Sequence, residues 1–178
     1  MSVRVAKSAG FCFGVNRAVE LVQSAAAAGK RTLTLGPIIH NRHVVEQFRK
    51  DGIGVIDTPE EARPGDTVII RSHGVSRQVF ERLTATGAEV IDATCPFVKR
   101  IHGLVSQAEA EGRLPIIIGT PTHPEVEGIA GWCGDCRIFD GPEALMRWVA
   151  EEQIDPNMPI CMVSQTTSTE SLWKLCRD

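Results

Sequence analysis

The sequence predicts an α/β protein built from small, repeated modules that each contain a parallel β-sheet. Short apolar segments alternate along the chain with amphipathic segments of helical period. The apolar segments lack the strict polar alternation of strands that have one face in water, which favours parallel sheets covered by helices on both faces. In addition, one unit occurs twice: a strand, a turn with a cysteine, a helix, a second strand and a histidine.

The two copies of this unit keep the same register. The separation between Cys12 and His40 in the first copy equals the separation between Cys95 and His123 in the second. Three further pairs match at the same offset as the two cysteines: Arg17 and Arg100, Gly29 and Gly112, and Gly36 and Gly119. We therefore interpret the chain as two copies of one α/β module.

Composition excludes several classes of protein. The 178 residues are 43% hydrophobic and 23% charged, with a net charge of −3, as in a globular protein without a basic surplus for nucleic acid or membrane surfaces. No apolar run approaches the roughly 20 residues that cross a bilayer, and the N-terminus lacks a signal-peptide pattern. We expect a cytoplasmic protein, in which six cysteines favour metal binding, catalysis or burial over a disulfide framework.

The elements of the first module follow from apolar spacing and from glycine stops. A helix after Cys12 should stop at Gly29, a second should close at Gly52, and Ser76 should cap a third that stops at Gly87. The expected strands are Val3–Lys7, Thr32–Leu35, Ile53–Ile56, Thr67–Arg71 and Glu89–Ile91.

The second module is expected to repeat this alternation. Pro96 suits the first turn of a helix, because its missing N–H would have no helical partner there. Further helices should follow His123 and begin at Pro142, and Ser168 should cap a final helix. The expected strands are Pro115–Ile118, Arg137–Phe139 and Pro159–Val163.

The polar candidates for a site all follow the predicted strands. In open parallel sheets, ligands bind at the carboxyl ends of the strands. The residues that fall at these ends are Cys12, His40, His73, Cys95, His123 and Thr166. This shared position predicts one site.

Cys12 and Cys95 stand at helix N-termini, where the helix dipole favours the thiolate. Two thiolates brought together by a repeat indicate iron–sulfur or zinc ligation. The alternative is burial without a ligand, which is common for a single cysteine but less so for a matched pair.

His40, His73 and His123 allow two interpretations. Neutral imidazoles ligate metals, whereas charged ones donate to anions such as phosphate. None has a short metal-binding spacing to a partner, so anion binding fits better than metal binding or a solvated surface position. Thr166 would add a hydroxyl and a nearby backbone N–H. His43 and His102 lie within helical stretches and are interpreted as structural.

Glu125 is the best carboxylate for proton transfer, because an acid buried beside anionic groups holds its proton near neutrality. Glu127 competes for this role, and an acid favoured by the helix start is the alternative for Glu125. Among the other cysteines, the CxxC pair of Cys133 and Cys136 would suit half a zinc site or a redox disulfide, but a second pair is missing. Cys161 is expected in the core, and Cys176, inside a helix, is not expected to be a ligand.

Six ordered motifs resemble those of the 4-hydroxy-3-methylbut-2-enyl diphosphate reductase family, the terminal enzymes of the non-mevalonate isoprenoid pathway. They are GFCFGVNRAV, GPIIHNRHVV, RSHGVS, DATCPFVKRIH, HPEVEGI and VSQTT, and they extend from the first strand to the last helix. The resemblance implies an oxidoreductase that converts its substrate to isopentenyl and dimethylallyl diphosphates. This reductive dehydroxylation takes two electrons, from ferredoxin or flavodoxin, and two protons.

The resemblance also implies the roles of individual residues. Cys12 and Cys95 match two of the three cysteines that hold a 4Fe–4S cluster, whose fourth iron binds the substrate hydroxyl. Glu125 matches the acid that supplies protons as the C–O bond breaks. The positions that match the surroundings of the diphosphate and the substrate are His40, His73, His123 and Thr166.

Family members have three pseudo-symmetric α/β domains, and this sequence resembles two of them. The third cysteine ligand and the serine and asparagine of the diphosphate pocket have no counterpart, so we expect a C-terminally truncated sequence. In this interpretation, residues 1–12 pair with the missing third domain, 13–94 form the first domain, and 95–178 form the second, incomplete at its C-terminus. The alternatives are a non-catalytic diphosphate- or metal-binding module, and a zinc site or redox switch at Cys133 and Cys136.

Overall fold

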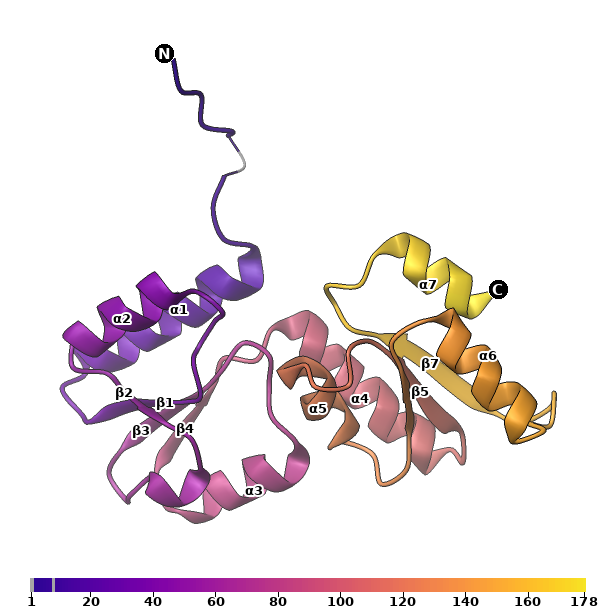
Figure 1. The fold of residues 1–178 in the computed structure, drawn as a ribbon. Helices are drawn as coiled ribbons and strands as arrows, with labels where there is room; N and C mark the ends of the chain where they lie inside the picture. Colours follow the sequence, from indigo (N-terminus) through magenta and orange to yellow (C-terminus); the bar gives the residue numbers. More distant parts are fainter. Residues whose placement is uncertain (1, 8) are drawn as a thin grey trace.

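The computed structural model describes residues 2–7 and 9–178, and within them it contains two parallel β-sheets (Figure 1). The first sheet has the strand order β2-β1-β3-β4, and the second has the order β6-β5-β7. Every strand pair in both sheets is parallel. The predicted fold class is therefore confirmed.

The described elements follow the predicted alternation closely. The strands are β1 (Thr32–Leu35), β2 (Gly54–Ile56), β3 (Thr67–Ile70), β4 (Glu89–Asp92), β5 (Leu114–Ile118), β6 (Arg137–Phe139) and β7 (Ile160–Ser164). The helices are α1 (Phe13–Ala27), α2 (Arg42–Lys50), the 3₁₀ turn η1 (Pro59–Glu61), α3 (Arg77–Ala85), α4 (Pro96–Ala110), α5 (Pro124–Ala130), α6 (Pro142–Glu151) and α7 (Glu170–Arg177).

Two expectations about elements differ from the structure. Ser168 does not cap the last helix: Thr169 does, accepting a hydrogen bond from the backbone N–H of Leu172 at 3.2 Å. Ser168 instead closes the preceding turn by donating its backbone N–H to the carbonyl of Gln165. The strand expected over Val3–Lys7 is also not formed within the described residues.

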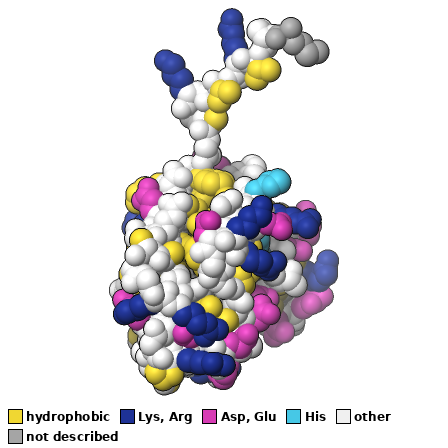
Figure 2. All heavy atoms as spheres, turned by 90° about the vertical axis from the view of Figure 1, so that its left-hand side faces the viewer, with side chains coloured by type: hydrophobic (Ala, Val, Ile, Leu, Met, Phe, Trp, Pro, Cys, Tyr) yellow, Lys and Arg dark blue, Asp and Glu magenta, His cyan; other side chains and the backbone are white. Residues whose placement is uncertain are grey.

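The N-terminal segment projects from the body of the molecule (Figure 1). Val3 and Val5 are 88% and 78% exposed, and Figure 2 shows apolar and basic side chains along the projection. A strand needs a hydrogen-bonded neighbour, and no described strand lies beside this segment. Its pairing with a further domain, like the domain boundaries at residues 13–94 and 95–178, stays a prediction.

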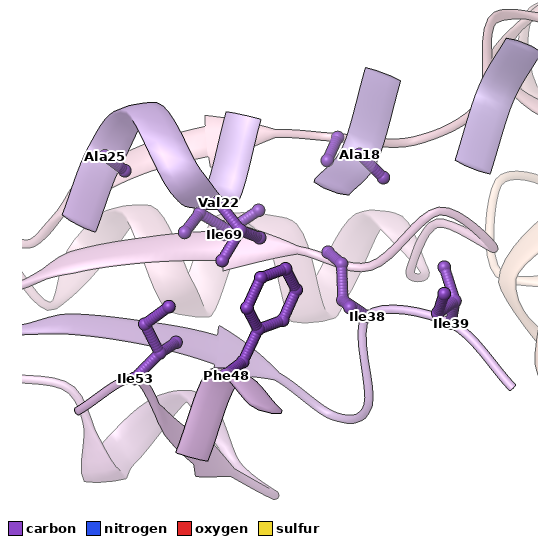
Figure 3. Packing of buried hydrophobic residues seen from close by; sticks show 9 residues of the cluster. Ala18, Val22, Ala25, Ile38, Ile39, Phe48, Ile53 and Ile69 are labelled. Carbon is purple, nitrogen blue, oxygen red and sulfur yellow. The ribbon is translucent and has the colours of Figure 1, made fainter. Parts of the chain in front are cut away.

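The core of the first sheet lies on both of its faces. All four residues of β3 are buried, as expected for a central parallel strand. Ile69 packs with Val22 of α1 and Phe48 of α2 on one face (Figure 3), while Val68 and Leu83 of α3 pack on the other. Helices α1 and α2 thus cover one face of the sheet and α3 covers the other, and the parallel strands end at the same edge.

The second sheet repeats this arrangement around β5. Ile117 packs with Val105 of α4 and Val126 of α5. Ile116 and its neighbours on the other face pack with Leu145 of α6. No helix among the described residues has both the length and the apolar content needed to cross a membrane.

The two sheet units meet where α5 packs on the loop between β3 and α3. A Cβ atom on Gly131 would lie 2.1 Å from the Cβ of Ser76, so the two backbones are in direct contact. The backbone N–H of Arg77 donates to the carbonyl of Gly131 at 3.2 Å, and the indole N–H of Trp132 donates to the carbonyl of Val75 at 2.8 Å. Only glycine permits this approach.

We predict opposite effects for two glycine-to-alanine substitutions. Gly131→Ala should lower the free energy of unfolding by about 1–3 kcal/mol, because its methyl group overlaps Ser76. Gly103→Ala, inside α4 with open space around it, should raise that free energy by about 0.5–1 kcal/mol. Urea unfolding followed by circular dichroism measures both; equal stabilities of the two variants would contradict the described contact.

Candidate functional site

Three histidines from separate loops converge at the carboxyl ends of the strands. His40 follows β1, His73 follows β3, and His123 follows β5 as the N-cap of α5. The ring centroids of His40 and His73 lie 4.4 Å apart, and those of His123 lie 5.7 Å from His40 and 5.6 Å from His73. The structure thus brings together the three histidines that the sequence predicted for one site.

The surroundings of His73 strongly affect its charge state. Its Nδ1 atom is buried and has no hydrogen-bond partner. Burial, and then the proximity of His40, His123 and Arg71, lowers the pKa of His73 to about 4. The ring is therefore neutral at pH 7, and a buried polar atom without a partner indicates a place for a ligand.

His123 connects the histidines to the predicted acid. Its Nδ1 accepts a hydrogen bond from the backbone N–H of Glu125 at 3.1 Å, which caps α5. Because Nδ1 is the acceptor, Nε2 carries the proton of the neutral ring and remains a donor. The cap therefore orients His123 as a hydrogen-bond donor at the same edge.

Glu125 and Thr166 form a tight pair. Glu125 is 2% exposed, and its carboxylate accepts hydrogen bonds from the backbone N–H of Thr166 at 2.6 Å and from its hydroxyl at 2.9 Å. Glu127 is exposed and lies near Arg71, where both line a different cavity of about 260 Å³. The two carboxyl groups therefore have different surroundings: that of Glu125 is buried against Thr166, and that of Glu127 is exposed near Arg71.

The two cysteines of the repeat occupy equivalent positions. Cys12 is the N-cap of α1 and Cys95 is the N-cap of α4, and neither side chain makes a capping hydrogen bond. A Cβ atom on Gly14 would lie 2.6 Å from the sulfur of Cys95, so the first turn of α1 packs directly on this thiol. The structure therefore brings the two cysteine-bearing helix ends together.

Backbone hydrogen bonds join the cysteines to the histidine loops. The N–H of Cys95 donates to the carbonyl of Ser72 at 2.9 Å, next to His73. Ser72 in turn donates its N–H and its hydroxyl to the carbonyl of Ile38, at 3.2 Å and 3.1 Å, in the loop that carries His40. One chain of bonds thus fixes three loops at the edge.

Two residues with a positioning role were missed in the sequence. Arg17, on α1, donates hydrogen bonds to the carbonyls of Thr94 and Asp92, at 3.2 Å and 3.3 Å. It thereby connects the helix that follows Cys12 to the segment that precedes Cys95. The side chain of Gln165 accepts a hydrogen bond from the backbone N–H of Thr120 and donates one to the hydroxyl of Thr167. The matched position of Arg17 within the repeat was the signal for the first residue, and Gln165 stands next to Thr166 in the VSQTT motif.

The remaining candidates lie outside these contacts. His43 is exposed on α2, and His102 is buried on α4. Cys161 is partly buried against the core, and Cys176 is buried in α7. Within residues 2–7 and 9–178, no group of three or more potential ligands is arranged to hold a metal ion.

We predict that acid destabilises the protein through buried neutral histidines. Burial lowers the pKa of His102 to about 4, against an ordinary value of 6.5. Between these values the unfolded chain binds more protons, so the free energy of unfolding falls as the pH drops from 6.5 to about 4. Urea titrations of His102→Gln should show a shallower decline, whereas the exposed His43→Gln should follow the parent; three parallel curves would contradict this assignment.

The comparisons with known proteins identify the family of this chain. The family model described as LytB protein matches residues 3–177. The 4-hydroxy-3-methylbut-2-enyl diphosphate reductases of Thermoanaerobacter sp. (strain X514) and Clostridium perfringens (strain 13 / Type A) are each 41% identical, over 98% and 97% of this chain. The chain spans about 60% of the length of these relatives.

Two solved structures share the fold. One, of (E)-4-hydroxy-3-methyl-but-2-enyl diphosphate reductase, the terminal enzyme of the non-mevalonate pathway, has a TM-score of 0.81 and 37% identity over 98% of this chain and 61% of its own. The other, E-1-hydroxy-2-methyl-but-2-enyl-4-diphosphate reductase from Plasmodium falciparum, has a TM-score of 0.86 and 28% identity over 96% of this chain and 53% of its own. The match of the family model over nearly all of the sequence means that this chain belongs to the LytB protein family.

Proposed function

We propose that this chain is the part of a 4-hydroxy-3-methylbut-2-enyl diphosphate reductase that binds the diphosphate and contributes two ligands to an iron–sulfur cluster. The reaction is the two-electron reductive dehydroxylation of (E)-4-hydroxy-3-methylbut-2-enyl diphosphate to isopentenyl and dimethylallyl diphosphates. The names of the relatives and the chemistry of the site support this reaction. The same proposal includes a cytoplasmic location and two domains, residues 13–94 and 95–178. It also includes the pairing of residues 1–12 with a third domain.

The histidine cluster is the single observation that carries the proposal. The ring centroids of His40, His73 and His123 lie no more than 5.7 Å apart, and the buried Nδ1 of His73 lacks a partner. Burial and mutual repulsion keep His73 neutral. A diphosphate would offset the repulsion at His73 and supply acceptors for N–H donors, so its binding favours protonation of His73.

Glu125 is proposed as the proton donor. Its buried carboxyl group touches Thr166, which lies at the end of β7 and is itself exposed. Thr166 holds the acid in place through its backbone N–H and its hydroxyl.

Cys12 and Cys95 fit two positions of a 4Fe–4S cluster. Both are soft donors at helix N-termini, neither is engaged as a cap, and Gly14 leaves room for the Cys95 sulfur beside α1. The cluster would supply the two electrons, received from ferredoxin or flavodoxin. A third thiolate would complete the ligand set, and Arg17 would keep the two present here at a fixed spacing.

The second candidate function is a non-catalytic diphosphate-binding module. The contacts among His40, His73 and His123 do not involve a cysteine, so this part of the site needs no cluster. Pyrophosphate binding together with an absence of reductase activity in the natural gene product would favour this alternative.

We predict that the chain binds inorganic pyrophosphate and takes up protons as it does so. Isothermal titration in buffers of different ionisation enthalpy at pH 7 measures both the affinity and the proton uptake. His73→Asn should weaken binding by about 10- to 100-fold, the loss of one hydrogen bond to a charged group. His43→Asn, exposed on α2, should bind as the parent does. Equal affinities of the two variants would overturn the assignment.

We predict that Glu125→Gln lowers kcat of the natural gene product by about 10²- to 10⁴-fold, as expected for loss of a general acid. Pyrophosphate affinity and iron content should remain near those of the parent, because glutamine is isosteric. Glu127→Gln is the matched control and should retain kcat, since that acid is exposed beside Arg71. If Glu127→Gln is the inactive variant instead, the proton role belongs to that residue.

A further inference from the structure

Cys133 and Cys136 lie in the turn between α5 and β6, outside the contacts of the site. Both side chains pack against the hydrophobic cluster around Val105, Ile117 and Val163. Gly134 and Asp135, between them, are exposed. The two sulfur atoms therefore lie on the inner side of one tight turn, while its outer side faces solvent.

The turn is held in shape from both sides. A carboxylate oxygen of Glu109, on α4, accepts hydrogen bonds from the backbone N–H groups of Gly134 and Asp135, the latter at 3.2 Å. The thiol of Cys133 donates to the carbonyl of Ala130 at 3.4 Å. These contacts hold the backbone of residues 133–136 in one closed turn.

The two thiols differ in acidity. The pKa of Cys136 is lowered, mainly by the adjacent thiol of Cys133, and Arg137 contributes to the same shift. The pKa of Cys133 is raised, mainly by Cys136 and then by burial. Such a pair has one thiol suited to attack and a second that stays protonated until the first has reacted.

Metal ligation fits this turn less well. A structural zinc site takes four ligands, and the described part of the chain brings no third cysteine, histidine or carboxylate into a ligating group with this pair. Cys161 contacts the same hydrophobic cluster but lies on β7 and joins no such group. Two thiols alone leave dithiol–disulfide chemistry as the fitting reaction.

We propose that Cys133 and Cys136 form a redox-active dithiol that closes to a disulfide by exchange with a low-molecular-weight disulfide. The Cys136 thiolate attacks one sulfur of that disulfide, forms a mixed disulfide and releases one thiol. Cys133 then loses its proton and attacks the Cys136 sulfur, releasing the second thiol. Two protein thiols are oxidised and one external disulfide is reduced, so electrons and protons balance. This inference is independent of the proposed function.

The pair also lies next to the helix that carries two of the candidate site residues. It follows the C-terminal end of α5, whose N-terminal end carries His123 and Glu125. Between the helix and the pair stands Trp132, which binds the carbonyl of Val75, two residues after His73. The dithiol therefore adjoins the segment that joins the two sheet units.

The test is a redox titration of the chain in oxidised and reduced glutathione, followed by rapid alkylation, trypsin digestion and mass spectrometry. Both cysteines fall in one peptide, residues 114–137, which has no internal lysine or arginine. We expect this peptide to pass, in one two-electron transition, from a doubly alkylated form to an unalkylated form lighter by two hydrogens than the dithiol.

Matched variants make the assignment specific. In Cys133→Ser and Cys136→Ser the two-electron transition should disappear, whereas Cys161→Ala, which alters the same cluster, should leave it in place. Double alkylation across the whole range of glutathione ratios would overturn the proposal. So would stable glutathionylation of both cysteines without pairing, or one zinc ion per chain released on alkylation of the pair.

Discussion

The site depends on the direct contact between α5 and the loop that follows β3. Gly128 and Gly131 present no side chain there, so the helix backbone lies against His73 and Ser76. Because His123 is the N-cap of α5, this contact places His123, from the second unit, next to His40 and His73 of the first. Larger residues at the two glycines would push the units apart and separate the imidazoles.

The consequences of this contact are electrostatic. Burial, and then the neighbouring His40, His123 and Arg71, disfavour positive charge on His73, whose buried Nδ1 has no partner. Leaving such an atom unsatisfied costs on the order of 1–3 kcal/mol. A multivalent anion would remove both penalties, and for this reason we propose a diphosphate rather than a neutral ligand. Thr166 fixes Glu125, and in our proposal this residue acts as the acid beside that anion.

Much of the fold was predictable from the sequence because its signals are local. Apolar runs, glycine stops and the cysteine–histidine repeat predicted the strands, the helices and the edge at which His40, His73 and His123 meet. The equal cysteine-to-histidine spacing in the two copies reflects one helix–strand unit, so the position of a side chain in one copy indicates its position in the other.

The parts that could not be predicted depend on contacts between distant segments. The sequence left Glu125 and Glu127 as competitors, because both follow His123 closely; burial on the face toward Thr166 separates them. The hydrogen bond from Arg17 to the carbonyl of Thr94, just before Cys95, joins segments far apart in the chain, and a local pattern does not reveal it. The apolar residues of Val3–Lys7 predicted a strand, but a strand forms only where another segment supplies its hydrogen bonds.

A crystal structure of this chain with inorganic pyrophosphate would test the central claim most directly. The account predicts a bound anion within hydrogen-bond distance of His40, His73 and His123, with a direct or water-mediated partner for the Nδ1 atom of His73. An anion bound elsewhere, with the three imidazoles unchanged and unoccupied at saturating pyrophosphate, would contradict it.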